Sequence, residues 1–205
     1  MIKATMMDYM GSDITVVNAA RVSFGKKSNN TYTTDKDEKL ISYLAEHKHM
    51  SPFGHCFASF HVKAPVFVAR QLVKHKFLRW NEISRRYVDE EPEFYVPDVW
   101  RGRAEDKKQG SEGVVDVGDW SDANWACLLA YKDLLDKGVA PEQARMILPQ
   151  SMMTEWYWSG SLDAFADMCN LRCASDTQVE TQSVAVQISR KMRSLFPVSW
   201  EALVR

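Results

Sequence analysis

Residues 71–87 read Gln-Leu-Val-Lys-His-Lys-Phe-Leu-Arg-Trp-Asn-Glu-Ile-Ser-Arg-Arg-Tyr, an unusually polar and cationic stretch. If its first part is helical, Gln71, Lys74 and His75 share one face. The donors that follow are Arg79, Asn81, Ser84, Arg85 and Arg86. Guanidinium groups that fork onto oxyanions, with hydroxyl and amide donors nearby, suit a phosphate group. The alternative is a solvated charged face, but interleaved aromatic residues favour a ligand groove: Phe77, Trp80 and Tyr87.

The segments before this stretch alternate between strand and helix patterns. Residues 55–63 predict a strand, because apolar side chains fall on one face: Cys56, Ala58, Phe60 and Val62. Pro65 suits the first turn of a helix that runs to about residue 76. Residues 35–48 predict another helix, with Leu40, Ile41 and Leu44 at helical spacing.

The rest of the chain is mostly helical in pattern. Residues 97–120 are charged and glycine-rich without a period, which predicts a loop or surface excursion. One predicted helix covers residues 122–137, with an apolar side made of Trp125, Leu128, Leu129 and Leu135. A short helix from Pro141 that ends before Pro149 and a helix over residues 161–172 follow. The last predicted helix opens with a Ser175/Gln178 capping box and ends near Pro197. With strand signal in the first half, this order favours an α+β fold: one domain, residues 1–205, with a mixed sheet flanked by helices.

Composition narrows the classes of partner. The chain has 26 basic and 27 acidic residues and a net charge of −1, so no basic surface for nucleic acid is expected. No apolar run approaches the ~20 residues that span a bilayer, and the first residues do not resemble a secretory signal. A cytoplasmic protein without a membrane partner is therefore expected.

Cysteines and metals offer little chemistry. The four cysteines form no Cys-x-x-Cys pair, and we expect reduced packing residues: Cys56, Cys127, Cys169 and Cys173. All five histidines lie between His47 and His75, yet no metal-ligand motif accompanies them, so no metal is expected. A Gly-x-Gly-x-x-Gly or a P-loop is also absent from the sequence.

A set of ordered motifs carries a resemblance to a known family. Lys74-His75-Lys76, seven residues, Ser84 and Arg85-Arg86-Tyr87 resemble the Arg-His-Arg, seven residues, Ser and Arg-Tyr of flavin-dependent thymidylate synthases. Other blocks agree in order: Ala20–Phe24, His49–His55, Phe60–Pro65, Glu142–Arg145 with Leu148-Pro149, and Leu171-Arg172 with Gln178–Glu180. The match covers about residues 1–100 and 122–196. Viral members of that family are often divergent, and this chain resembles a divergent member.

The resemblance implies that family's fold and its reaction. It implies conversion of dUMP to dTMP, with FAD as cofactor, methylenetetrahydrofolate as carbon donor and NADPH as reductant. It also implies a homotetramer, in the cytoplasm of a host if the chain is viral.

The resemblance also assigns site residues by position. Flavin-side positions are His49, Ser51, Lys74, His75, Lys76, Glu82, Ser161, Asp163 and Asp167. Nucleotide positions are Gln71, Lys74, Glu82, Ile83, Ser84, Arg85, Arg86 and Arg145, the last from a neighbouring subunit. Arg172 matches the catalytic arginine that contacts the pyrimidine and favours ionisation of N3.

Several positions depart from the family pattern. Both arginines of Arg-His-Arg are lysines, which keep the charge but lose the planar fork. Ser161 and Asp163 stand where the family usually has Asn and Arg, and Asp167 where it has Asn. Two alternatives therefore stay open: the same fold acting on another pyrimidine nucleotide such as dCMP, and a weakened flavin- or nucleotide-binding homologue.

Overall fold

The computed structural model describes residues 1–88, 90–105 and 110–204. Its strands are β1 (Lys3–Met10), β2 (Phe57–Pro65), β3 (Leu78–Glu82), β4 (Trp100–Arg103), β5 (Ser111–Val115) and β6 (Met153–Ser161). Its α-helices are α1 (Asp13–Arg21), α2 (Asp35–Glu46), α3 (Val66–Leu72), α4 (Ser121–Asp136), α5 (Pro141–Ala144), α6 (Leu162–Arg172), α7 (Val179–Leu195) and α8 (Pro197–Leu203). Short 3-10 turns lie at Val22–Phe24 (η1), Phe53–His55 (η2) and Arg145–Ile147 (η3).

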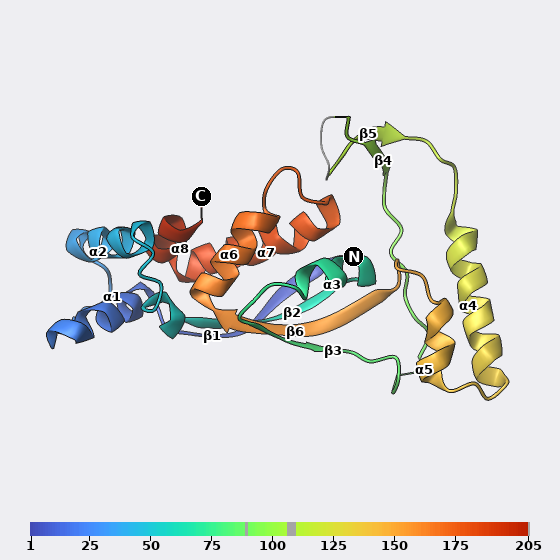
Figure 1. The fold of residues 1–205 in the computed structure, drawn as a ribbon, viewed down its shortest axis with the longest axis horizontal. Helices are drawn as coiled ribbons and strands as arrows, with labels where there is room; N and C mark the ends of the chain where they lie inside the picture. The colour runs from blue at the N-terminus through green and yellow to red at the C-terminus, as the bar shows by residue number, and fades with distance from the viewer. Residues whose placement is uncertain (89, 106–109, 205) are drawn as a thin grey trace.

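A four-stranded sheet in the order β1-β2-β6-β3 forms the centre of the molecule (Figure 1). Each neighbouring pair is antiparallel. Alternate residues of β2 and β6 are buried, so one face of the sheet carries the core. Aromatic rings dominate that core: Phe60 contacts Phe165 of α6 at 5.3 Å between ring centroids, and Trp158 contacts the same ring at 5.7 Å.

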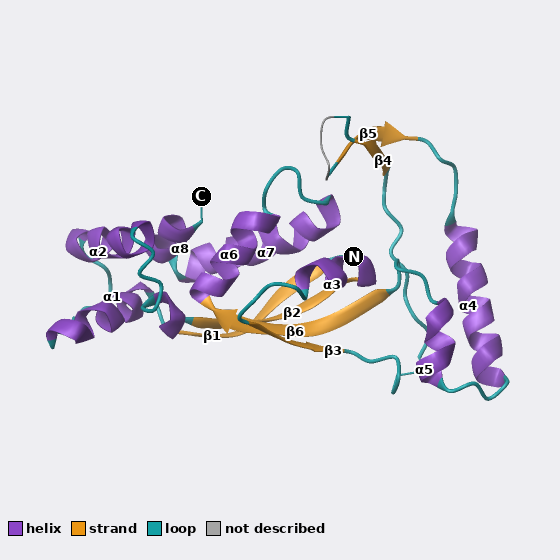
Figure 2. Ribbon diagram, in the orientation of Figure 1, coloured by secondary structure: helices purple, strands orange, loops and turns teal. Residues whose placement is uncertain are grey.

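Apart from α3, which packs against β2, β6 and α7, the helices divide into three groups around the sheet (Figure 2). Helices α6 and α7 cover the core face, because their apolar stripes include Phe165, Met168, Ile188 and Met192, all buried. Helices α1, α2 and α8 pack together at one end of the sheet. Helices α4 and α5 and the β4–β5 hairpin extend from the opposite end of the sheet. These elements therefore contribute little to the central core.

Most of the predicted elements are confirmed, and so is the α+β class. Residues 35–48 contain α2, residues 55–63 overlap β2, and residues 122–137 contain α4 except for its first residue. The short helix ends before Pro149, residues 161–172 contain α6, and α7 ends at Leu195. The predicted mixed sheet is antiparallel in each described pair.

The helix that follows Pro65 is shorter than predicted. Pro65 is the N-cap of α3, and α3 ends at Leu72 rather than near residue 76. The chain then turns through Phe77, which has a left-handed φ of 64°, and enters β3. Gln71, Lys74 and His75 therefore do not share a helical face, and that prediction is wrong.

Three other expectations need correction. Strand β6 lies in the half of the chain that was expected to be helical, although its alternation of buried and open residues follows a strand period. Residues 97–120 contain the β4–β5 hairpin rather than only loop, and residues 106–109 lie outside the described part. Gln178 is the N-cap of α7 but makes no side-chain capping bond, so the predicted capping box is absent there.

The apolar side of α4 is only partly covered. Leu128 is buried, whereas Trp125 is 56% exposed and Leu129 is 50% exposed. Packing within one chain therefore does not account for this helix.

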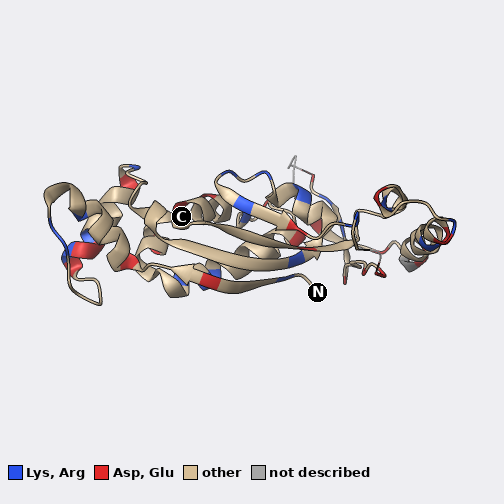
Figure 3. Ribbon diagram, turned by 90° about the horizontal axis from the view of Figure 1, so that it is seen from below, with Lys and Arg blue, Asp and Glu red and all other residues tan. Residues whose placement is uncertain are grey.

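Charge is distributed without a dominant sign. Lys and Arg are intermixed with Asp and Glu on the elements drawn in Figure 3. Within the described residues, each helix is too short or too polar to cross a membrane.

Candidate functional site

A cationic cavity of about 810 Å³, here called the first cavity, lies beside α3, the end of β3 and the turn after α5. Four arginines line it: Arg70, Arg85, Arg86 and Arg145. Two glutamates, Glu82 and Glu142, line it as well. The described lining therefore has more positive than negative side chains, which suits a phosphate group.

Glu82 and Ser84 in the first cavity both accept hydrogen bonds from neighbouring side chains or backbone. Glu82 accepts hydrogen bonds from Trp80 Nε1 at 3.0 Å and from Thr154 Oγ1 at 2.8 Å. Ser84 Oγ accepts from the backbone N–H and from Nε of Arg86, both at 3.3 Å. Glu82 is thus held by Trp80 and Thr154 rather than by an arginine of the cavity, although Arg85 Nη1 donates to the carbonyl of Glu90.

The structure brings the expected nucleotide residues Glu82, Ile83, Ser84, Arg85 and Arg86 to this cavity. Arg145 lines the same cavity within one chain, with its Nε donating to the carbonyl of Glu142 at 3.2 Å. The contribution of Arg145 from a neighbouring subunit to the nucleotide site stays a prediction. Arg70 was not singled out from the sequence, although it lies directly before the stretch of residues 71–87.

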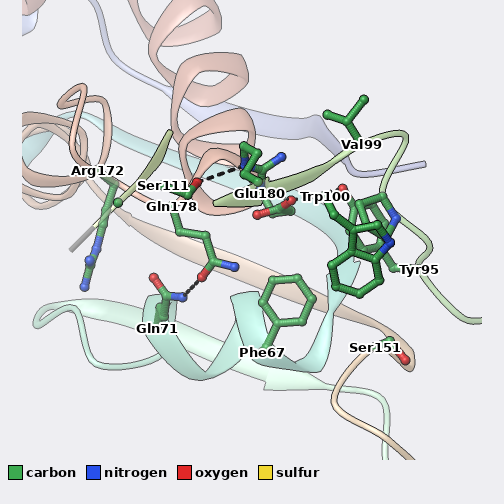
Figure 4. A pocket seen from close by; sticks show the side chains of 13 residues that line it. Phe67, Gln71, Tyr95, Val99, Trp100, Ser111, Ser151, Arg172, Gln178 and Glu180 are labelled. Carbon is green, nitrogen blue, oxygen red and sulfur yellow. Dashed lines mark hydrogen bonds and ion pairs between the residues drawn. The ribbon is translucent and has the colours of Figure 1, made fainter. Parts of the chain in front are cut away.

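A second cavity, of about 780 Å³, lies on the other side of α3 (Figure 4). Phe67 and Gln71 line it, whereas Ala69, Arg70 and Val73 line the first cavity. A seven-residue helix therefore separates the expected contacts Gln71 and Arg172 from the arginines of the first cavity.

Amide groups form one polar wall of the second cavity. Gln71 Nε2 donates to Gln178 Oε1 at 2.5 Å, and Thr181 Oγ1 donates to Gln71 Oε1 at 3.2 Å. Gln71 and Gln178 face each other in Figure 4. These bonds connect α3 to the start of α7 and fix the orientation of the Gln71 side chain.

A buried carboxylate forms the opposite wall. Glu180 is 4% exposed, and its Oε1 accepts from Arg101 Nη2 at 2.5 Å and from Tyr95 OH at 3.2 Å. Burial acts to raise the pKa of Glu180, but the hydrogen bonds and charge of Arg101 outweigh it and hold that pKa below its usual value. Burial and the Glu180 charge raise the pKa of Tyr95 to about 12. None of the three was assigned a role from the sequence.

His75 and Arg172 meet although 97 residues separate them. Arg172 Nε donates to His75 Nε2 at 3.1 Å, and Arg172 also lines the second cavity. Burial, followed by the charge of Arg172, lowers the pKa of His75 to about 4. The imidazole is therefore neutral near pH 7.

The chain is similar to proteins of one family along most of its length. A family profile described as "Thymidylate synthase complementing protein" matches residues 5–198. The flavin-dependent thymidylate synthase of Kosmotoga olearia is 39% identical over 209 residues, covering 97% of this chain and 88% of the relative. The corresponding protein of Thermus thermophilus is 41% identical over 206 residues, covering 96% of this chain and 73% of the relative.

The chain belongs to the flavin-dependent thymidylate synthase family.

A solved structure extends the likeness to three dimensions. The UMP/dUMP methylase PolB from Streptomyces cacaoi, bound with 5-Br dUMP, superposes with a TM-score of 0.88 at 33% identity. The alignment covers 98% of this chain and 94% of PolB. The similarity therefore includes the elements that line both cavities.

The flavin-side positions expected of this family lie apart from the first cavity, except for Glu82. His49 and Ser51 are exposed in the loop before η2, and Lys74 and Lys76 are exposed in the turn after α3. Ser161 is the N-cap of α6 and pairs with Phe57 across the sheet, which places η2 beside the start of that helix.

Two acidic departures lie one turn apart on α6. Asp163 Oδ1 is buried without a hydrogen-bond partner among the described residues. Burial and the Asp163 charge raise the pKa of Asp167, and Lys48 partly offsets them. This part of the family site therefore offers acceptors where an arginine would offer donors.

The cysteines do not form the lining of either cavity within the described part of the chain. Burial raises the pKa of Cys56 to about 12, and burial also raises the pKa of Cys169. A hydrogen bond from Cys169 lowers the pKa of Cys173, which lies directly after Arg172. The described residues contain no group of three or more side chains placed to hold a metal ion.

Proposed function

We propose that this protein converts dUMP to dTMP, with methylenetetrahydrofolate as carbon donor and reduced FAD as hydride donor. The observation that carries the proposal is the first cavity, in which the family's serine and arginine positions converge around a cationic space. Membership of the family supplies the reaction class.

The nucleotide would be held by two kinds of contact. Ser84, Arg85, Arg86 and Arg145 would bind the phosphate, because hydroxyl and guanidinium donors complement its oxygens. Arg172 would bind the pyrimidine ring. A guanidinium beside N3 stabilises negative charge on that nitrogen and polarises the ring toward attack at C6.

The residues present fit FAD if the acidic positions of α6 contact a different part of the cofactor than the family's usual residues do. Lys74, His75 and Lys76 would face its phosphates, together with Ser51 and His49. The orphaned Oδ1 of Asp163 needs a hydrogen-bond donor, which a ribose hydroxyl or an adenine amine supplies. We therefore assign the acidic positions of α6, with Ser161, to the adenosine half of FAD rather than to its pyrophosphate. FAD, when bound, supplies the redox chemistry.

A complete site would require more than one chain. Helix α3 and its side chains are about 10 Å across, and they separate the first cavity from Gln71 and Arg172 in the second. One nucleotide can contact both sets only if a second copy supplies one of them. Exposed apolar residues on the extended end support such contacts: Val114, Trp120, Trp125, Leu129 and Met146. We infer a homotetramer, as in the family expectation.

Three further parts of the proposal rest on the family resemblance. NADPH is the reductant, which is tested by replacing it with NADH at equal concentration. Residues 1–205 act as one domain, since the family match spans residues 5–198. The enzyme works in the cytoplasm, which fractionation of the producing cells tests.

A second substrate has specific support. The similar structure is named a UMP/dUMP methylase, so the ribonucleotide UMP is a candidate alongside dUMP. The dCMP alternative from the sequence has no comparable observation behind it.

The decisive experiment is a product assay. Purified protein would be incubated with FAD, NADPH, methylenetetrahydrofolate and one of dUMP, UMP or dCMP, and methylated nucleotide measured by chromatography. We expect dTMP from dUMP, and almost none from the Arg172→Ala protein. Flavin absorbance retained after desalting reports FAD binding separately. A protein that holds flavin but methylates none of the three nucleotides would contradict the proposal.

A further inference from the structure

We propose that His75 is a positioning residue for Arg172, whose guanidinium it orients toward the pyrimidine ring without reducing the guanidinium's charge. The inference rests on the proposed function, because it assigns a role within the same nucleotide site. This positioning role differs from the flavin contact expected of His75, because it depends on a hydrogen bond between the side chains of His75 and Arg172.

The hydrogen bond determines the tautomer of His75. Arg172 Nε carries a proton that a guanidinium does not lose in proteins, so His75 Nε2, 3.1 Å away, must accept it. The imidazole proton then resides on Nδ1. The imidazole is half-buried, and the adjacent positive charge of Arg172 disfavours a second proton.

His75 is held in a fixed position by its own contacts. Its backbone N–H donates to the carbonyl of Leu72 at 3.1 Å, at the end of α3. Its ring meets the buried Trp158 edge-on, with 6.5 Å between ring centroids and 61° between planes. Arg172, by contrast, is the last residue of α6 and has a long side chain with many rotamers. The bond to His75 selects among those rotamers.

The neutral acceptor is the chemically informative feature. A carboxylate in this place would also orient Arg172, but its negative charge would offset the positive charge that the pyrimidine anion needs. None of the ion pairs found among the described residues includes Arg172. Imidazole therefore provides direction and leaves the charge intact.

The bond also decides which atoms remain for the substrate. With Nε committed to His75, the two Nη groups are left to serve the second cavity, which Arg172 lines. Two parallel donors match adjacent nitrogen and oxygen acceptors, such as N3 and a neighbouring carbonyl of an ionised uracil. Loss of His75 would let the fork rotate away from that edge.

A double-mutant cycle tests the inference. dUMP affinity would be measured by calorimetry for His75→Leu, His75→Gln, Arg172→Ala and the two double variants, without FAD and at saturating FAD. We expect His75→Leu to weaken dUMP about tenfold, and His75→Gln, which keeps an acceptor, to weaken it less than threefold. In the Arg172→Ala background both changes should have no further effect. Equal losses in the two backgrounds would overturn the inference, and circular dichroism checks that each variant is folded.

Nitrogen NMR of histidine side chains gives a readout that needs no substrate. In the unaltered protein at pH 7, His75 should show protonated Nδ1 and unprotonated Nε2, and Arg172→Ala should raise its pKa toward 6.5, the usual value. A protonated Nε2, or signals unchanged by Arg172→Ala, would refute the pairing. If dUMP failed to bind the unaltered protein, the proposed function would fail, while NMR would still decide whether His75 and Arg172 are paired as inferred.

Discussion

Arg101→Met removes the cation that faces the buried Glu180 carboxylate, and we expect a large loss of stability. Breaking a buried ion pair on one side typically costs about 3–5 kcal/mol, because the remaining charge is left uncompensated. Arg101 is 22% exposed and Tyr95 still donates to Glu180, so water and one hydrogen bond reduce the cost. We therefore expect about 2–3 kcal/mol at pH 7.5. The measurement is urea unfolding at fixed protein concentration, because association also changes apparent stability.

The pH dependence of this effect has a definite sign. In the unaltered protein the folded pKa of Glu180 is depressed, so its stabilising contribution is present above the unfolded pKa and is lost as pH falls through the folded pKa. Without Arg101, burial raises the folded pKa instead. The carboxylate then becomes protonated on mild acidification, so the difference between the two proteins should shrink from pH 7.5 to about pH 4.5.

Two controls separate the charge from the packing. Arg101→Lys keeps the cation without the fork and should lose less than half as much stability as Arg101→Met. Adding Glu180→Gln to Arg101→Met should recover part of the loss, because no charge remains buried. A loss below 1 kcal/mol for Arg101→Met, or a loss that grows on acidification, would refute the reasoning.

Three other predictions concern the site, and a fourth concerns the sheet. Replacing all four cysteines by serine should leave measurable dTMP formation, because no cysteine lines either cavity among the described residues. In the same chromatographic assay, Arg172→Ala should nearly abolish dTMP formation. Lys74→Arg should tighten FAD about fivefold, roughly 1 kcal/mol, by restoring a bidentate fork toward its phosphates; calorimetry that shows lost FAD binding would mean that the pocket is shaped around lysine. Mixing Arg86→Ala with Arg172→Ala protein under subunit exchange should restore some activity if sites form between chains, whereas no recovery in verified mixed oligomers would count against shared sites. Gly160→Ala should lower the midpoint of thermal unfolding by several degrees, since an added Cβ would lie 2.3 Å from Leu78 Cδ2 and 3.1 Å from Phe77 O.

Local patterns predicted the amphipathic elements well. The periods of α2, β2, α6 and α7 were readable because each buries one face against the same core. Strand β6 was missed although Trp156 and Trp158 alternate with open residues, since large aromatic residues also suit helices that pack in a core. The end of α3 was misplaced because the left-handed turn at Phe77 lacks a glycine or proline signal.

The candidate site divides in the same way. Ser84, Arg85 and Arg86 were predictable because a contiguous motif carries them, and so was Arg172 through the resemblance. Arg70 and Glu180 were not, since a charged residue acquires a role only from what faces it. The separation of the two cavities by α3 was not readable either, because Gln71 and Arg70 are neighbours in the chain yet line different cavities.

By itself, the sequence determined the α+β class, most helices and the motif residues, because these depend on period and local order. Only the tertiary structure decided that His75 meets Arg172 and that Arg101 compensates Glu180. Such contacts join residues 97 and 79 positions apart, and they form only when the sheet order and helix packing bring those segments together. Hydrogen bonds act over about 3 Å, so their partners follow from the folded geometry, which local sequence patterns do not contain.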